Sequence, residues 1–263
     1  MKAITDIKEL RGIQLDLLEE IHRFCQEHHI VYYLSSGTLL GAVRHGGYIP
    51  WDDDIDLYMP RESYERFVKE YTDTEGRFTL MEPRRSKHYF YTFAKLTDSR
   101  TMMVEDSYTS YPIGVYVDIF PLDYVTECLW KRRWIFWLKR KLFCIYADKC
   151  LPLLVDYSPW HVFKRGVCQL MPVRASVLRK WLMDLAFHKQ PTQWVCNMTE
   201  VGPSVKGCFP AECVTEDVDI IFEGKCFKTM KGFTEYLSRT YGDYMKLPPE
   251  NQRQIHHFEA YWR

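Results

Sequence analysis

Residues 34–59 restrict the possible folds of this chain most strongly, through the sequence LSSGTLLGAVRHGGYIPWDDDIDLYM. The first half has the small and apolar composition of a short helix, which is expected to stop at Gly46 and Gly47. The second half predicts a strand over residues 54–59. Side chains in a strand repeat every two positions, so Asp54 and Asp56 are expected to point to the same face. The segment therefore predicts a helix beside a strand that carries paired carboxylates.

The paired carboxylates predict a metal site. Two like charges on one face repel each other unless a cation lies between them. Mg²⁺ accepts oxygen ligands at about 2 Å and keeps positions open for phosphate oxygens. We therefore expect Asp54 and Asp56 to belong to a site for phosphoryl or nucleotidyl transfer. The alternative is a solvated acidic turn, which the apolar neighbours Trp51, Ile55 and Leu57 disfavour.

A third carboxylate is found in the β-rich run GVYVDIF at residues 114–120. An aspartate in the middle of an otherwise apolar strand costs free energy unless it has a partner. Asp118 is therefore predicted to be the third metal ligand. The alternative is an ion pair between Asp118 and Lys95 or an arginine.

The remaining patterns predict an α+β fold. Apolar residues at helical spacing predict a helix over residues 6–28, and Pro60 is expected to begin another helix that ends near residue 71. β-rich runs occupy residues 31–34, 77–81, 89–96, 101–105 and 114–120. Helices are predicted over 159–200 and 232–241, and strands at 208–209 and 218–227. This order predicts a mixed sheet flanked by helices.

Charge divides the chain into three segments, although its formal net charge is zero. Residues 1–124 contain 14 Lys and Arg against 21 Asp and Glu, whereas residues 125–200 contain 13 against 5. Residues 201–263 are nearly balanced, with 8 against 9. We therefore expect an acidic catalytic core over 1–124, a basic helical insert over 125–200 and a C-terminal segment over 201–263 that completes the catalytic domain.

The basic insert contains LWKRRWIFWLKRKLFCIYADK at residues 129–149, which interleaves tryptophans with the six basic residues Lys131, Arg132, Arg133, Lys139, Arg140 and Lys141. A basic helix rich in tryptophan suits the surface of an anionic membrane, so residues 129–145 are a candidate for peripheral membrane contact. The alternative is a helix that packs its aromatic side chains inward and presents a solvated basic face. A nucleic-acid partner is disfavoured, because the acidic first segment would repel a phosphate backbone.

The nine cysteines include no CxxC pair, which disfavours a zinc finger and favours reduced, mostly buried thiols. The N-terminal residues MKAITDIKELRG lack an apolar core of signal-peptide length, and no stretch reaches the length of a membrane span. We therefore expect a cytoplasmic protein that associates, if at all, with the inner face of the membrane.

Three ordered motifs carry a resemblance to a known family. The strings SGTLLGAVRHGGYIPWDDDIDLYMPR, YVDIFPLD at 116–123 and YLSRTYGDYMKLPP at 236–249 closely resemble the LicD family of bacterial choline-phosphate transferases. Fukutin and the fukutin-related protein are animal relatives of that family. The resemblance extends from about residue 14 to the C-terminus and is weakest over 125–205. It implies a nucleotidyltransferase-like fold and transfer of a phospho-alcohol from a CDP-activated donor, such as CDP-choline, to a sugar hydroxyl.

The resemblance also implies roles for individual residues. Asp54, Asp56 and Asp118 correspond to carboxylates that bind Mg²⁺, with Mn²⁺ as an alternative. Gly37 and Thr38 stand where related enzymes bind donor phosphates with Gly-Ser or Gly-Gly, so Thr38 replaces the usual serine. Further candidates for contact with phosphate, choline or acceptor are Arg44, Lys95, Trp51, Phe120, Tyr124 and His256. Asp118 would either activate the attacking hydroxyl through a shared metal or accept its proton.

The implied acceptor is a cell-surface glycan or its lipid-linked precursor, of the teichoic acid, lipopolysaccharide or capsule type. A polyprenyl-linked acceptor would explain a basic aromatic insert at the membrane. The main alternative is a metal-dependent glycosyltransferase that uses the same carboxylates on a nucleotide sugar. The two hypotheses differ in the donor that is consumed.

Overall fold

The computed structural model describes residues 1–73, 76–85, 89–104, 113–152, 158–186, 190–199, 205–253 and 259–263. Its main sheet has the strand order β2 (Tyr33–Leu34), β3 (Asp56–Pro60), β7 (Tyr116–Tyr124), β5 (Ala94–Asp98) and β4 (Phe78–Met81). β3 and β7 are parallel, and the other pairs along this path are antiparallel. The expected mixed sheet is therefore confirmed.

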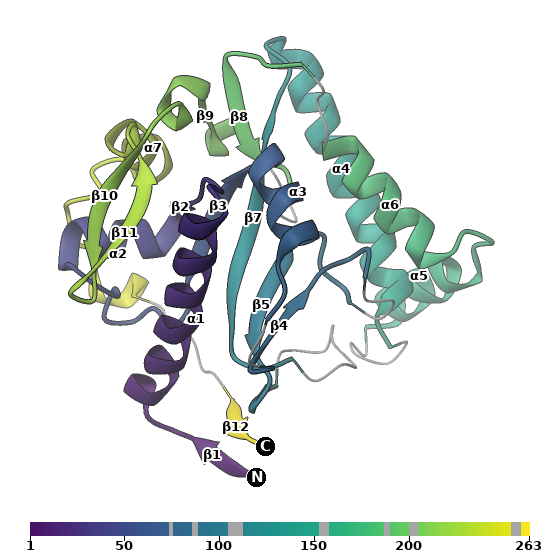
Figure 1. Cartoon of the computed structure of the whole chain (residues 1–263). Coiled ribbons are helices and arrows are strands. Elements are labelled where there is room, and N and C mark those ends of the chain that lie inside the picture. Colours follow the sequence, from purple (N-terminus) through teal and green to yellow (C-terminus); the bar gives the residue numbers. More distant parts are fainter. Residues whose placement is uncertain are drawn as a thin grey trace.

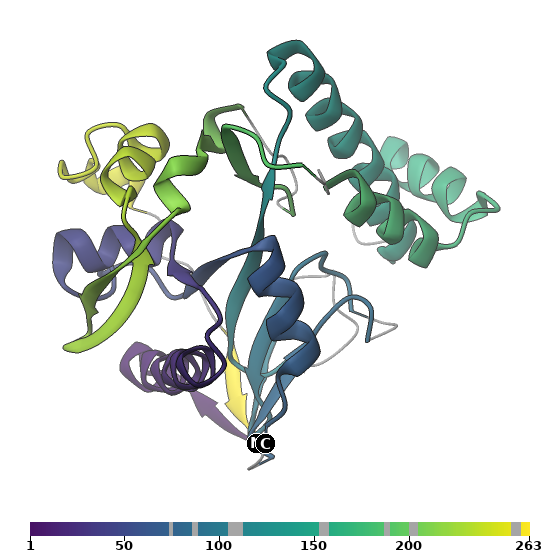
Figure 2. The same cartoon turned by 45° about the horizontal axis from the view of Figure 1, so that its top comes forward.

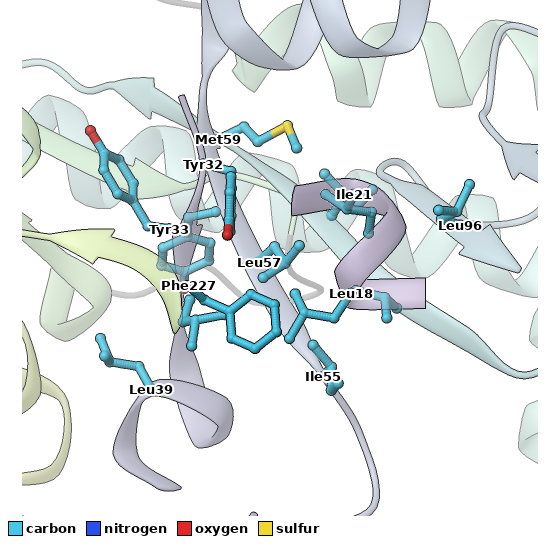
Figure 3. Packing of buried hydrophobic residues seen from close by; sticks show 14 of the residues in the cluster. Leu18, Ile21, Tyr32, Tyr33, Leu39, Ile55, Leu57, Met59, Leu96 and Phe227 are labelled. Carbon is cyan, nitrogen blue, oxygen red and sulfur yellow. The ribbon is translucent and has the colours of Figure 1, made fainter. Parts of the chain in front are cut away.

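One face of the sheet is covered by α1 (Ile7–Glu27) and α3 (Arg61–Glu70), as Figure 1 shows. The apolar stripe of α1 includes Leu18 and Ile21, which are fully buried. In Figure 3 both side chains lie beside Leu57 of β3. Because strand side chains alternate, β3 directs Leu57 into this core and leaves Asp56 on the opposite face. The helix predicted over residues 6–28 is confirmed, and it fixes which face of the sheet remains for the site.

The opposite face carries α2 (Ser36–His45) and α7 (Phe233–Tyr241), while a hairpin of β10 (Asp217–Phe222) and β11 (Lys225–Met230) lies beside β2 and also contacts α1. Tyr58 of β3 contacts Tyr236 of α7, with ring centroids 5.9 Å apart. The strand predicted over 218–227 is wrong, because the chain reverses at Glu223 and Gly224. Both residues have positive φ, of 51° and 75°, as a two-residue hairpin turn requires.

A helical lobe projects from the end of the sheet (Figure 2) and consists of α4 (Leu129–Cys150), α5 (Pro159–Leu170) and α6 (Ala175–Ala186). Among the residues that the structure describes, no helix has the length and hydropathy needed to cross a bilayer. The helices predicted up to residue 200 end too late. Trp194–Asn197 form β8, which pairs with the last residues of β7 and with β9 (Cys208–Pro210). The division into segments at residues 124 and 200 remains a prediction.

The two ends of the chain meet in a small second sheet, visible at the bottom of Figure 1. It has the order β1 (Lys2–Ile4), β12 (Ala260–Trp262) and β6 (Thr101–Met103). The sequence patterns did not predict β1 or β12, because three-residue strands show no periodicity. Two other predicted strands begin late, since β3 starts at Asp56 and β5 starts at Ala94. Short 3₁₀ turns η1 (Val205–Gly207), η2 (Ala211–Val214) and η3 (Glu250–Gln252) complete the described elements.

A buried ion pair joins α3 to β7. Arg61 donates to both carboxylate oxygens of Asp123, at 2.7 and 2.5 Å, and Asp123 is 1% exposed. Replacing Asp123 with Asn leaves the guanidinium without its charge partner, so we expect the free energy of unfolding to fall by about 3–5 kcal/mol. Urea denaturation measures this change. Asp184→Asn, in an exposed pair with Lys180 on α6, is the matched control and should change stability little; equal effects of the two variants would contradict the account.

Candidate active site

A cleft of about 980 Å³ opens on the face of the sheet that carries α2. One wall comes from α2 and the acidic loop after it, and the other from the chain that follows α7. Residues of the first wall include Ser36, Gly37, Leu40, Arg44, Ile49, Trp51, Asp52, Asp54 and Asp56; those of the second include Tyr241, Asp243, Tyr244, Lys246, Leu247, Pro248, Pro249, Glu250 and Arg253. Segments about 200 residues apart in the sequence therefore form one site.

Helix α1 holds the acidic loop in place from behind. Arg11 donates to the backbone carbonyls of Ile49 at 2.9 Å and Asp52 at 2.6 Å, and Gln14 donates to the carbonyl of Asp53 at 2.6 Å. These bonds occupy backbone oxygens and leave the carboxylates of the loop directed elsewhere. Asp54 precedes β3 instead of belonging to it, and it lines the same cleft as Asp56. Strand alternation therefore does not apply to Asp54, because the strand begins two residues later than expected, and what the structure shows is that Asp54 and Asp56 line one cleft.

Three charged side chains stand in one row across the sheet. Asp56 of β3 is in register with Asp118 of β7, and Asp118 is in register with Lys95 of β5. Adjacent strands lie about 4.8 Å apart, so the two aspartates are immediate neighbours. The Lys95 ammonium lies 2.7 Å from Oδ1 of Asp118. The pairing with Lys95, weighed above as the alternative for Asp118, is thus present in the structure.

The environment of Lys95 differs from that of a phosphate clamp. Its side chain is buried, and the ammonium lies 3.3 Å from the ring centroid of Tyr116 and 4.4 Å from that of Tyr91. Aromatic faces attract a cation, so these rings and Asp118 fix the ammonium. Lys95 is not among the residues that line the cleft. The structure thus places Lys95 as a counter-ion of Asp118, and its predicted contact with phosphate stays a prediction.

Burial raises the pKa of Asp56 well above its ordinary value, and the negative charges of Asp54, Asp118 and Asp52 raise it further. The nearby Lys95 acts in the opposite direction. The folded chain therefore concentrates negative charge at this point without balancing it fully. A cation placed among these oxygens would lower the repulsion.

At the start of α2, Gly37 lines the cleft and Thr38 contacts the beginning of β3. A Cβ on Gly37 would come within 2.4 Å of Oδ2 of Asp52, so this position excludes a side chain because the carboxylate occupies the space. Thr38 is buried, and its hydroxyl accepts a hydrogen bond from the Asp56 backbone N–H at 2.9 Å. Thr38 therefore connects α2 to β3 and positions Asp56, and its predicted contact with phosphate stays a prediction.

Two arginines place positive charge on the cleft. Arg44 lines it and donates to the Tyr244 carbonyl at 3.0 Å, which connects the two walls. Burial lowers the pKa of Arg44, and the positive charge of Arg253 lowers it further, against the opposing influence of Tyr241. Arg253 lies 5.0 Å from the ring centroid of Trp51. The cleft therefore joins anion-binding groups with an aromatic face that already accepts a cation.

The remaining predicted contacts separate into two groups. Trp51 lines the cleft, as expected. Phe120 packs against Phe93 with ring centroids 4.3 Å apart and is not a lining residue. Tyr124 is six positions beyond Asp118 on β7, about 20 Å away at the rise of a strand, so its predicted place beside the carboxylates is wrong. His256 lies outside the described residues.

The donor set of this site fits a hard divalent cation. Asp54, Asp56 and Asp118 offer only oxygen atoms, and the crowding of negative charge on Asp56 favours a positive ion. Within the described part of the chain, no three His, Cys, Asp or Glu side chains are gathered closely enough to enclose an ion as they stand. The assignment of these three residues as metal ligands therefore remains a prediction.

The individual patterns missed the contribution of the C-terminal wall. Tyr241 lines the cleft, and its pKa is raised by burial first and then by nearby groups that include Asp56. Lys246 and Arg253 add cations to the same wall. The signal for the wall was the motif YLSRTYGDYMKLPP, which contains Tyr241 and Lys246 but gives no direction in which they face.

Comparison with known proteins identifies the family of the chain. A family model described as "LicD/FKTN/FKRP, nucleotidyltransferase domain" matches residues 29–155. The chain is 33% identical over 269 aligned residues to the lipopolysaccharide cholinephosphotransferase LicD of Haemophilus influenzae, with 99% of each chain covered. A short match to the human ribitol 5-phosphate transferase FKRP is 65% identical over 26 residues and covers 10% of this chain and 5% of that protein. This chain belongs to the LicD family.

Proposed function

We propose that this protein transfers phosphocholine, or a related phospho-alcohol, from a CDP-activated donor to a sugar hydroxyl of a glycan and releases CMP. The observation that carries the proposal is the register of Asp56 with Asp118 on parallel strands, beside the cleft that Asp54 and Asp56 line. The similarity to a lipopolysaccharide cholinephosphotransferase over nearly the whole chain supports the same activity.

The cations of the cleft bind the donor's diphosphate. Arg44, Lys246 and Arg253 line the cleft from both walls, so a diphosphate between them would contact positive charge on each side. Guanidinium groups suit this task, because they donate several hydrogen bonds in fixed directions. The indole of Trp51 and the carboxylates of Asp243 and Glu250 are also at the cleft, and such groups suit a quaternary ammonium.

The carboxylates hold the metal and activate the acceptor. Asp54, Asp56 and Asp118 would bind one or two Mg²⁺ ions, with Mn²⁺ as an alternative, which supply positive charge that stabilises the leaving nucleotide. The acceptor oxygen attacks the phosphorus that bears the alcohol, the bond from that phosphorus to the CMP oxygen breaks, and a carboxylate of the cluster accepts the hydroxyl proton. Thr38 supports the step by holding the backbone of Asp56.

The acceptor that we propose is a cell-surface glycan or its lipid-linked precursor, of the teichoic acid, lipopolysaccharide or capsule type. The match to an enzyme named for lipopolysaccharide supports a glycan as the acceptor class. We place the reaction in the cytoplasm or at the inner face of the membrane, where CDP-activated donors are made.

A donor screen tests the function directly. Purified protein incubated with CDP-choline, CDP-ethanolamine, CDP-ribitol and CDP-glycerol, each with Mg²⁺ and a glycan extract, should release CMP from at least one donor, and EDTA should stop the release. Chromatography of nucleotides measures the product. If no CDP-alcohol is consumed while a nucleotide sugar is, the glycosyltransferase alternative replaces this proposal.

A further inference from the structure

Helix α5 buries a charged side chain and exposes apolar ones, which is the reverse of a typical helix in a water-soluble protein. Its buried residues are Arg165 and Cys168. Arg165 and its neighbour Lys164 face Asp148 of α4, with N···O distances of 3.9 and 2.6 Å. An amphipathic helix in water normally buries its apolar stripe and exposes its charges. Helix α5 has the reverse orientation, so contact with water alone does not explain its exposed side.

The outer side of α5 is a continuous apolar stripe. Trp160, Phe163, Val167 and Leu170 recur every three or four residues and therefore lie on one side of the helix. Their exposed fractions are 67%, 64%, 49% and 87%. Scattered single apolar residues on a surface need no explanation, but a contiguous stripe of this kind marks an interaction surface.

Helix α4 buries the aromatic side chains of Phe136 and Tyr146 but shows part of the same inversion. Trp130, Trp134 and Trp137 are exposed, whereas Arg132 and Lys139 are buried. Arg132 donates to the Thr126 carbonyl at 2.9 and 2.7 Å, which accounts for its inward direction. The inward packing of aromatic residues, weighed above as the alternative for this helix, is therefore wrong for these three tryptophans. Two of the six basic residues assigned there to lipid are also unavailable.

The two apolar stripes face the same side of the lobe. Asp148, which contacts α5, follows Trp137 by eleven residues, or about three helical turns, so both lie on one side of α4. α5 therefore packs on the side of α4 that carries the exposed tryptophans, further along its axis. Helix α5 directs Lys164 and Arg165 toward α4, so its apolar stripe faces away from α4. This is also the side of α4 to which Trp137 points.

The lobe concentrates the exposed apolar surface of the molecule. Across the described residues, eleven of the eighteen exposed large apolar side chains lie between positions 129 and 181, and they include all five exposed tryptophans. The main body of the protein therefore has no comparable accumulation in the part of the chain that the structure describes. A specific property of the lobe is needed to explain this bias.

We propose that the helical lobe docks on an anionic lipid membrane, with the α5 stripe and the α4 tryptophans inserted at the boundary of head groups and acyl chains. The exposed cations Lys131, Arg133, Arg140 and Lys141 alternate with the tryptophans on α4 and bind the lipid head groups. A second copy of the chain fits this surface less well, because a symmetric dimer brings the same positive residues against each other.

Vesicle binding tests the proposal without any substrate, so its result is independent of the donor screen. The full chain should co-sediment with vesicles of equal phosphatidylglycerol and phosphatidylcholine at least tenfold more tightly than with phosphatidylcholine alone, and the difference should shrink in high salt. The triple variant Trp160→Ser, Phe163→Ser, Leu170→Ser should bind at least tenfold more weakly. Ile221→Ser, at a 54% exposed residue of β10 outside the lobe, should bind like the parent.

A second readout covers a loss of folding in the triple variant. Lipids brominated in their acyl chains should quench the tryptophan fluorescence of the parent, and Trp160→Phe should reduce this quenching while the affinity stays within about threefold. Absence of parental binding to anionic vesicles would overturn the proposal, as would equal binding of the triple variant. A parental dimer that the triple variant dissociates, without any vesicle binding, would assign the surface to a second copy instead.

Discussion

Asp56→Asn should reduce CMP release from the CDP-alcohol donor on the order of 10³-fold, because it removes a charge from the proposed metal site. The same variant should unfold at an equal or higher temperature than the parent. Burial and the neighbouring carboxylates raise the pKa of Asp56, so its ionised form is disfavoured by folding at neutral pH and a neutral amide removes that cost. Initial rates and thermal unfolding measure the two effects.

The control for this variant is Asp184→Asn, which neutralises an exposed carboxylate of α6 in the lobe. Its rate and its unfolding temperature should match those of the parent. Activity of Asp56→Asn within tenfold of the parent would contradict the role of this carboxylate. If Asp56→Asn lost both its activity and its folded state, the predicted equal or higher unfolding temperature would be wrong.

Lys95→Met should destabilise the metal-free protein by about 3–5 kcal/mol, because it leaves the Asp118 carboxylate without its buried counter-ion. The rings around Lys95 would tolerate a methionine of similar length, so packing should change little. Mg²⁺ should restore part of the lost stability, since an ion held by Asp118 would supply the missing positive charge. Urea denaturation in EDTA and in Mg²⁺ measures both steps.

Asp118→Asn should also destabilise the protein, in contrast to Asp56→Asn, because it leaves the buried ammonium of Lys95 without a carboxylate. Lys180→Met, which removes the exposed partner of Asp184, is the matched control and should have little effect. An unchanged free energy of unfolding in Lys95→Met would show that the pair contributes nothing to the fold. Destabilisation that Mg²⁺ does not relieve would separate the ion pair from the metal site.

Local patterns predicted the parts of this fold that depend on neighbouring residues. The stripe of α1 and the alternation of β7 are periodic over many residues, and both elements are observed. Elements that depend on distant contacts were missed, since β1 pairs with β12 across nearly the whole chain. The turn at Glu223 and Gly224 was missed because apolar residues on both sides suggested one continuous strand.

For the site, too, the sequence predicted the part that depends on neighbouring residues. Asp54 and Asp56 were grouped by their spacing, which is a local property, and both line the cleft. The proximity of Asp118 to Asp56 depends on the register of two strands about 60 residues apart. Residue spacing in the sequence carries no information about that register. Tyr124 was misplaced because six residues along an extended strand span about 20 Å, although they are close in the sequence. The opposing wall with Arg253 could not be predicted, because only the folded chain brings this residue to the cleft.

We propose that Asp54, Asp56 and Asp118 together bind a divalent ion beside the cleft. Crystals grown with Mn²⁺ and CMP, and measured for anomalous scattering of manganese, test it most directly. The account predicts an anomalous peak within about 2.5 Å of carboxylate oxygens from all three residues, with Lys95 moved away from Asp118. A peak elsewhere, or an Asp118 that still contacts only Lys95 while CMP occupies the cleft, would contradict it.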